Sequence, residues 1–190
     1  MRRLVILAAV VFCTTGSSLM AADLSWRASG KGGAIAAGGA DAVQAGMAML
    51  ESGGNAADAA AATVLALTVT DHGMVCIGAE VPMIIYDAQT GEVKALSGQG
   101  GAPLDPEAIK WYYEHGIQQV KDTPKTAAVP ALPSLVMAAL KLYGTKSFEE
   151  AAAPTLKLLD AGKQDWHKPL AATLRRLIET ERKTPGSRVE

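Results

Sequence analysis

The chain is poor in the residues that mark several protein classes. Its 190 residues include two cysteines, Cys13 and Cys76. Cys13 lies in an apolar leader that we expect to be removed, so no intramolecular disulfide is predicted. The 18 basic and 19 acidic residues give a formal net charge of −1, which does not indicate a surface for nucleic acid or an anionic membrane. The apolar run Leu4–Phe12 is far shorter than the ~20 residues that a membrane span needs, so no span is predicted.

Aromatic residues are scarce as well, at 5% of the chain, and Phe148 is the only phenylalanine after the first 22 residues. The apolar residues lean on alanine, which contributes little buried area per residue. A core of this kind gains stability from close approach of its helices or from packing against further chain. We therefore interpret residues 23–190 as one domain that is part of a larger fold.

The first residues have the pattern of an export signal. A basic pair, Arg2 and Arg3, precedes the apolar run, and the small residues Ala21 and Ala22 close the segment. This order is typical of a secretory signal peptide rather than of a transmembrane helix. We predict a signal peptide over residues 1–22 and a periplasmic or secreted mature protein.

Periodicity and turn residues predict a helix-rich chain with one hairpin. Asn55 is suited to cap a helix, and Asp58 three residues later completes a capping box. Asp105 followed by Pro106 is typical of another helix start. Gly91 permits the positive φ that a short hairpin needs. The sequence predicts a strand at 33–37, helices at 41–52, 56–69, 106–115, 135–142, 147–160 and 169–183, and a hairpin of strands 81–86 and 93–97.

An ordered series of short motifs is the strongest functional signal. Each motif alone is common, but their order and spacing are specific. The motifs are Ala42-Val43-Gln44-Ala45-Gly46-Met47, Leu50-Glu51-Ser52-Gly53-Gly54-Asn55-Ala56-Ala57-Asp58, Thr70-Asp71-His72, Ile84-Ile85-Tyr86-Asp87, Gly98-Gln99-Gly100-Gly101-Ala102-Pro103, Ala128-Val129-Pro130, Leu142-Tyr143-Gly144-Thr145, Ala153-Pro154 and Ala161-Gly162. Together they resemble the N-terminal part of the large subunit of the γ-glutamyltransferases, also called glutathione hydrolases.

The resemblance implies a fold class and a chemistry. The fold is α+β and helix-rich, a partial N-terminal nucleophile hydrolase-type α/β/β/α layered sandwich. In the family a precursor cuts itself to expose a threonine, whose hydroxyl attacks the γ-glutamyl carbonyl. No threonine here has the flanking pattern of that processing site, so we name no catalytic residue. We expect the Thr nucleophile in the protein's own missing small-subunit segment, a small γ-glutamyl compound such as glutathione as substrate, and no cofactor.

One substrate contact of the family falls inside this chain. The resemblance places Gln99 where the family has an arginine that binds the α-carboxylate of the γ-glutamyl group. A guanidinium suits that task because its planar fork donates two charge-assisted hydrogen bonds to one carboxylate. An amide donates a neutral bond, so we expect weaker or altered γ-glutamyl recognition at Gln99.

Other residues that carry chemistry have plainer interpretations. His72 beside Asp71 resembles a base with its orienting carboxylate, but a histidine held by local bonds at a helix end is favoured. Cys76 is interpreted as a buried small hydrophobic residue rather than a nucleophile. His115 and His167 stand alone, and no pair of residues has the spacing of metal ligands, so no metal site is predicted.

Two function hypotheses remain open. The first is an exported γ-glutamyltransferase or glutathione hydrolase. The second is an exported, catalytically inactive binding or interaction protein on the same scaffold. Gln99 motivates the second, as do Glu80 and Pro82, which stand where the family has consecutive glycines. Glycines allow close backbone approach, so these two residues indicate a loop of different path.

Overall fold

A computed structural model describes residues 29–101, 104–116 and 129–184. The described residues from Gly32 onward belong to one compact unit, and residues 29–31 belong to another. The predicted signal peptide over residues 1–22 lies outside the described residues. Within the described ranges, no helix is both long and apolar enough to cross a bilayer.

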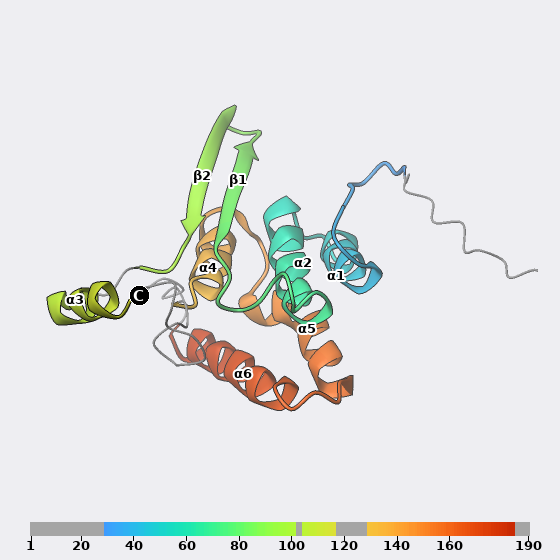
Figure 1. The fold of residues 1–190 in the computed structure, drawn as a ribbon. Helices are drawn as coiled ribbons and strands as arrows, with labels where there is room; N and C mark the ends of the chain where they lie inside the picture. The colour runs from blue at the N-terminus through green and yellow to red at the C-terminus, as the bar shows by residue number, and fades with distance from the viewer. Residues whose placement is uncertain (1–28, 102–103, 117–128, 185–190) are drawn as a thin grey trace, which may run out of the picture. The chain divides into compact units, whose positions relative to one another are not determined.

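The elements of the described residues confirm the helix-rich α+β prediction (Figure 1). The helix over 106–115 has the predicted bounds, and the other predicted helices and strands begin or end within a few residues of the observed ones. The elements in chain order are α1 (Ala40–Glu51), α2 (Ala56–Thr70), β1 (Val81–Asp87), β2 (Glu92–Gly98), α3 (Pro106–His115), α4 (Leu132–Tyr143), α5 (Phe148–Ala161) and α6 (His167–Lys183).

Helix α2 is the centre of the helical core. It contacts α1, α4 and α5, and α6 packs against α5. Most of its alanines are buried, and so is Leu65. Small side chains let helix axes come close, so the core compensates for its scarcity of aromatic residues through tight packing. The largest fully buried side chains are Phe148, Leu65, Leu132, Leu140, Leu159 and Leu174.

The contact between α1 and α2 depends on a glycine. Gly46 is buried in α1, and a β-carbon built on it would lie 2.2 Å from Thr63 Oγ1 of α2. The same carbon would lie 3.2 Å from the carbonyl oxygen of Ala59. The Thr63 hydroxyl is held in place because it donates a hydrogen bond of 2.7 Å to that carbonyl oxygen. Position 46 therefore has no room for a methyl group unless α1 and α2 separate.

We expect Gly46→Ala to lower the free energy of unfolding by about 1–3 kcal/mol, because overpacking outweighs the gain of about 1 kcal/mol in helix propensity. Urea unfolding followed by circular dichroism measures the change. Removing the obstructing hydroxyl in a Gly46→Ala/Thr63→Ala double variant should restore part of the loss. Gly73→Ala is the control, since a β-carbon there has no neighbour within 4 Å. Equal effects at positions 46 and 73 would refute the packing explanation.

The two strands form an antiparallel hairpin in which Val81 pairs with Gly98 and Asp87 with Glu92. Its turn contains Gly91 at φ 72°, as the sequence predicts. One face of the hairpin is partly buried and β2 contacts α4. The other face is exposed and apolar, because Ile84, Tyr86 and Val93 are 76%, 66% and 67% exposed.

The predicted strand over residues 33–37 is wrong. This segment has no strand structure, and the sheet of the described residues consists of β1 and β2 alone. The apolar pattern had a different cause, since Ile35 and Ala37 pack against the helical core. A strand requires a neighbouring backbone to accept its hydrogen bonds, and β1 and β2 pair with each other instead.

Candidate functional site

Two parts of the structure bear on function: a polar network around Asp58, and a cleft beside Gln99. The network begins where α1 ends. Gly53 has φ 83°, and its N–H donates to the carbonyl oxygen of Leu50 at 3.0 Å, while the N–H of Gly54 donates to that of Met49 at 2.8 Å. This pair of bonds is a Schellman motif, which turns the chain sharply into the next helix.

Asn55 and Asp58 form the predicted capping box of α2. The Asn55 side chain accepts from the N–H groups of Ala57 and Asp58, and the Asp58 carboxylate accepts from the N–H of Asn55 at 2.8 Å. The box therefore satisfies amides that the first turn of a helix leaves without partners. In addition, Asn55 Nδ2 donates to the carbonyl oxygen of Tyr143 at 2.6 Å, which joins this helix start to the end of α4.

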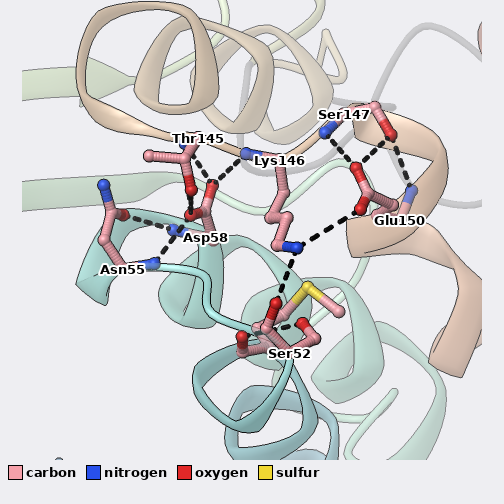
Figure 2. A network of polar contacts seen from close by, with 8 residues as sticks. Ser52, Asn55, Asp58, Thr145, Lys146, Ser147 and Glu150 are labelled. Atoms are coloured by element: carbon pink, nitrogen blue, oxygen red, sulfur yellow. Dashed lines mark hydrogen bonds and ion pairs between the residues drawn. The ribbon is translucent and has the colours of Figure 1, made fainter.

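Asp58 reaches further than a capping residue needs to. Its carboxylate accepts from the N–H of Thr145 at 2.9 Å, the Thr145 hydroxyl at 2.8 Å and the N–H of Lys146 at 3.0 Å (Figure 2). The side chain is fully buried. Gly144 allows this approach, because a β-carbon there would lie 2.6 Å from Asp58 Oδ1. Asp58 thus fixes the α4–α5 connection to the start of α2.

The hydrogen bonds also set the charge of Asp58. Burial alone raises the pKa of this carboxyl, but the donors from Asn55, Lys146 and Thr145 outweigh burial and hold its pKa below the ordinary value. The carboxylate is therefore ionised near neutral pH. It accepts hydrogen bonds from backbone N–H groups and a hydroxyl of this chain. Asp58 therefore has a structural role and is not an acid or base that is accessible to a substrate.

A second capping box extends the network on the α5 side. Ser147 and Glu150 exchange the reciprocal bonds of the box, and the Ser147 donors lower the pKa of Glu150. Lys146 Nζ donates to the carbonyl oxygen of Ser52 at 2.9 Å and lies 3.5 Å from Glu150 Oε1. The C-terminal ends of α1 and α4 are joined in this way to the N-terminal starts of α2 and α5 (Figure 2).

The cleft lies between the end of β2 and the start of α4. It has a volume of about 400 Å³, within the range of small-molecule sites. Gln99 is exposed at its rim, at the position that the resemblance assigns to substrate binding. The described residues that line it are Leu96, Ser97, Gln99, Gly100, Gly101, Val129, Pro130, Ala131, Ser134, Leu135 and Ala138.

Two glycines bring the walls of this cleft together. A β-carbon on Gly98 would lie 2.6 Å from the carbonyl oxygen of Val81 and 2.8 Å from Leu135 Cδ2. A β-carbon on Gly100 would lie 2.5 Å from the carbonyl oxygen of Val129. The chain around Gln99 therefore runs directly against the segment that leads into α4. A larger residue at either glycine would widen the cleft or displace Gln99.

The remaining predicted residues lie elsewhere. His72 is exposed, with its ring centroid 5.2 Å from that of Trp166. His115 Nδ1 lies 2.8 Å from the carbonyl oxygen of Trp111. His167 is buried at the start of α6, and Nδ1 has no hydrogen-bond partner among the described residues. The prediction that Cys76 is buried is wrong, because it is exposed in the loop after α2.

No group of three or more potential metal ligands occurs in the described ranges. Glu80 is exposed, and Pro82 lies within β1 opposite Ser97. Proline is tolerated in a strand at a sheet edge, where its missing N–H removes no ladder bond.

A sequence profile of the gamma-glutamyltranspeptidase family matches residues 42–188. The chain belongs to this family. The matched residues include those of the Asp58 network and of the Gln99 cleft. The family assignment and the helix-rich α+β fold confirm what the ordered motifs imply.

Known relatives agree with the assignment. The chain is similar to a glutathione hydrolase proenzyme of Bacillus subtilis, with 32% identity over 137 residues, which cover 70% of this chain and 23% of that protein. Among solved structures it resembles the Helicobacter pylori gamma-glutamyltranspeptidase, with a TM-score of 0.60, 29% identity, and coverage of 85% of this chain and 46% of that one. It also resembles a cephalosporin acylase from Bacillus halodurans, with a TM-score of 0.55, 32% identity, and coverage of 64% and 23%.

The chain therefore spans about a quarter of the length of the curated relatives that it matches. Sequence reasoning located one rim of the cleft, Gln99, through the family motif. It missed the opposite wall, which includes Val129 and Ser134, because no sequence spacing links residue 99 to residues some thirty positions later.

Proposed function

We propose that the complete protein acts on γ-glutamyl compounds, as a glutathione hydrolase or γ-glutamyltransferase, through a Thr nucleophile that lies outside this chain. The observation that carries the proposal is the family match over residues 42–188, together with a curated relative named glutathione hydrolase proenzyme. The word proenzyme agrees with a precursor that is processed before it acts. The described residues then supply a scaffold and two facing walls of a substrate cleft.

Release of 4-nitroaniline from γ-glutamyl-4-nitroanilide by the full gene product tests the proposal. We expect turnover that is abolished when the nucleophilic threonine is replaced by alanine. Absence of turnover in a correctly folded full-length protein would instead support the second function, an inactive binding protein on the same scaffold. The specific observation that favours the second function is the neutral Gln99 at the cleft.

The Gln99→Arg variant is expected to lower KM for γ-glutamyl-4-nitroanilide by about ten- to a hundredfold, because a charged donor contributes ~1.5–3 kcal/mol to a hydrogen bond with a carboxylate. Steady-state kinetics on the full-length protein measure the change. Gln44→Arg is the matched control, since Gln44 is exposed in α1 and does not line the cleft. An unchanged KM at position 99 would remove this residue from the substrate site.

We also propose that the protein is exported and reaches the periplasm or the exterior after loss of residues 1–22. The basic pair Arg2 and Arg3, the apolar run after it and the small pair Ala21 and Ala22 support this. N-terminal sequencing of the protein from a cell fractionation should give Asp23 as the first residue in the exported fraction. Retention of Met1 in the cytosol would contradict export.

A further inference from the structure

The Gln99 cleft has a chemical character that narrows the class of ligand. None of its described lining residues carries a charge. The polar side chains are one amide, from Gln99, and two hydroxyls, from Ser97 and Ser134. Leu96, Leu135 and neighbouring small residues provide the rest of the surface. Such a lining forms neutral hydrogen bonds and an apolar contact, but it offers no cation to an anionic group.

The Gln99 amide both donates and accepts hydrogen bonds, whereas a carboxylate only accepts them. A carboxylate at Gln99 would bond the NH₂ group and leave the amide oxygen facing negative charge. A carboxamide or other neutral amide matches both ends of the side chain. A lining of neutral side chains favours the uncharged member of two ligands that have the same shape and differ in one charge.

One feature of the cleft favours an anion, but its effect on affinity is small. The start of α4 borders the cleft through Ala131 and Ser134, and no side chain caps this helix. An exposed helix start favours a negative group by about two- to fivefold. A missing charged donor costs about ten- to a hundredfold. The helix start therefore does not replace the absent cation.

We propose that the cleft beside Gln99 selects an uncharged, amide-bearing head group over a free carboxylate. This inference rests on the proposed function: the preferred donors are γ-glutamyl compounds whose α-carboxyl is masked as an amide. Gln99 is the residue that determines this specificity, and Ser134, an exposed residue on the facing wall, adds a neutral bond.

The test compares two donors that share a 4-nitroanilide leaving group. One is γ-glutamyl-4-nitroanilide, and the other carries an α-carboxamide in place of the α-carboxylate. We expect the full-length protein to have a kcat/KM at least tenfold higher for the carboxamide, mainly through KM. Gln99→Arg should reverse the preference, while Gln44→Arg leaves it unchanged. Turnover of both donors with the carboxylate preferred would overturn this inference and leave the proposed function intact.

A binding measurement keeps the inference testable if neither donor is turned over, which would count against the proposed function. Isothermal titration calorimetry of the full-length protein compares L-glutamine with L-glutamine α-amide, which differ only at the α-carboxyl. Tighter binding of the amide by tenfold or more, lost in Gln99→Arg, supports the inference. Equal affinity, tighter binding of L-glutamine, or no binding of either would overturn it.

Discussion

Replacing Asp58 with alanine is expected to lower the free energy of unfolding by about 3–5 kcal/mol, the largest loss that we predict for a polar residue. The substitution leaves the N–H groups of Asn55, Thr145 and Lys146 without the acceptor that they share. Because the carboxylate is fully buried, water does not readily take its place. Urea unfolding of the full chain, followed by far-UV circular dichroism, measures the loss.

Asp105→Ala is the matched control for this prediction. Asp105 also caps a helix and accepts from the N–H of Glu107 at 3.0 Å. Its helix α3, however, has no buried residue, so loss of the cap should cost about 1 kcal/mol or less and leave the core unaffected. If both substitutions had equal effects, Asp58 would be only a cap, and its bonds to the α4–α5 connection would contribute nothing.

The pH dependence of stability separates the charge of Asp58 from its shape. Because its folded pKa is lowered, the carboxylate stabilises the fold fully above the unfolded pKa of about 3.9, and this contribution is lost as the pH falls through the folded pKa. The free energy of unfolding of the wild-type chain should therefore exceed that of an Asp58→Asn variant by a constant amount from about pH 6 to 8. This difference in stability should become smaller below about pH 4. A gap that widened on acidification would have the wrong sign.

Replacing Phe148 with alanine is expected to cost about 3–5 kcal/mol of unfolding free energy. Phe148 is fully buried and is the largest of the buried side chains. It also begins α5, where its backbone N–H donates to the Glu181 carboxylate of α6 at 3.1 Å. Removing the ring from the hydrophobic core leaves a cavity that the surrounding structure fills only in part.

Chemical unfolding of three variants tests the role of Phe148. Phe148→Leu should lose about 1–1.5 kcal/mol, since leucine fills most of the same volume. Leu142→Ala is the control for deletion of an apolar side chain, because Leu142 is 60% exposed and its loss should cost well under 1 kcal/mol. A Phe148→Ala cost below 1 kcal/mol would show that the surrounding helices close the cavity.

Local signals in the sequence predicted the elements well. Asn55 with Asp58, Asp105 with Pro106, and Ser147 as the start of a helix each mark a boundary through hydrogen bonds to residues two or three positions away. Such bonds depend on nearby residues alone. The predicted positive φ at Gly91 was confirmed for the same reason, because it depends on the conformational freedom of that glycine alone.

Long-range partners were the part that the sequence did not specify. Arg175 of α6 pairs with Asp160 of α5, fifteen positions earlier in the chain. Arg182 likewise pairs with Glu149. Packing of α5 on α6 brings these groups within reach, and no periodicity within one helix reports that packing.

The candidate cleft follows the same pattern. Gln99 was found because the family gives its position a role in substrate binding. The sequence did not place Val129 and Ser134 opposite it, because the approach of β2 to α4 depends on the absence of side chains at Gly98 and Gly100. The exposure of Cys76 was missed because the loop after α2 does not continue the apolar helix that precedes it.

The hairpin has a consequence for handling the protein. Ile84, Tyr86 and Val93 form an apolar ribbon surface, and each strand has one unpaired edge in the described part of the chain. The unpaired edge of such a hairpin can pair with a strand of another chain, so high protein concentration favours self-association. Dilute buffers, or a lysine introduced by Ile84→Lys, should keep preparations monodisperse.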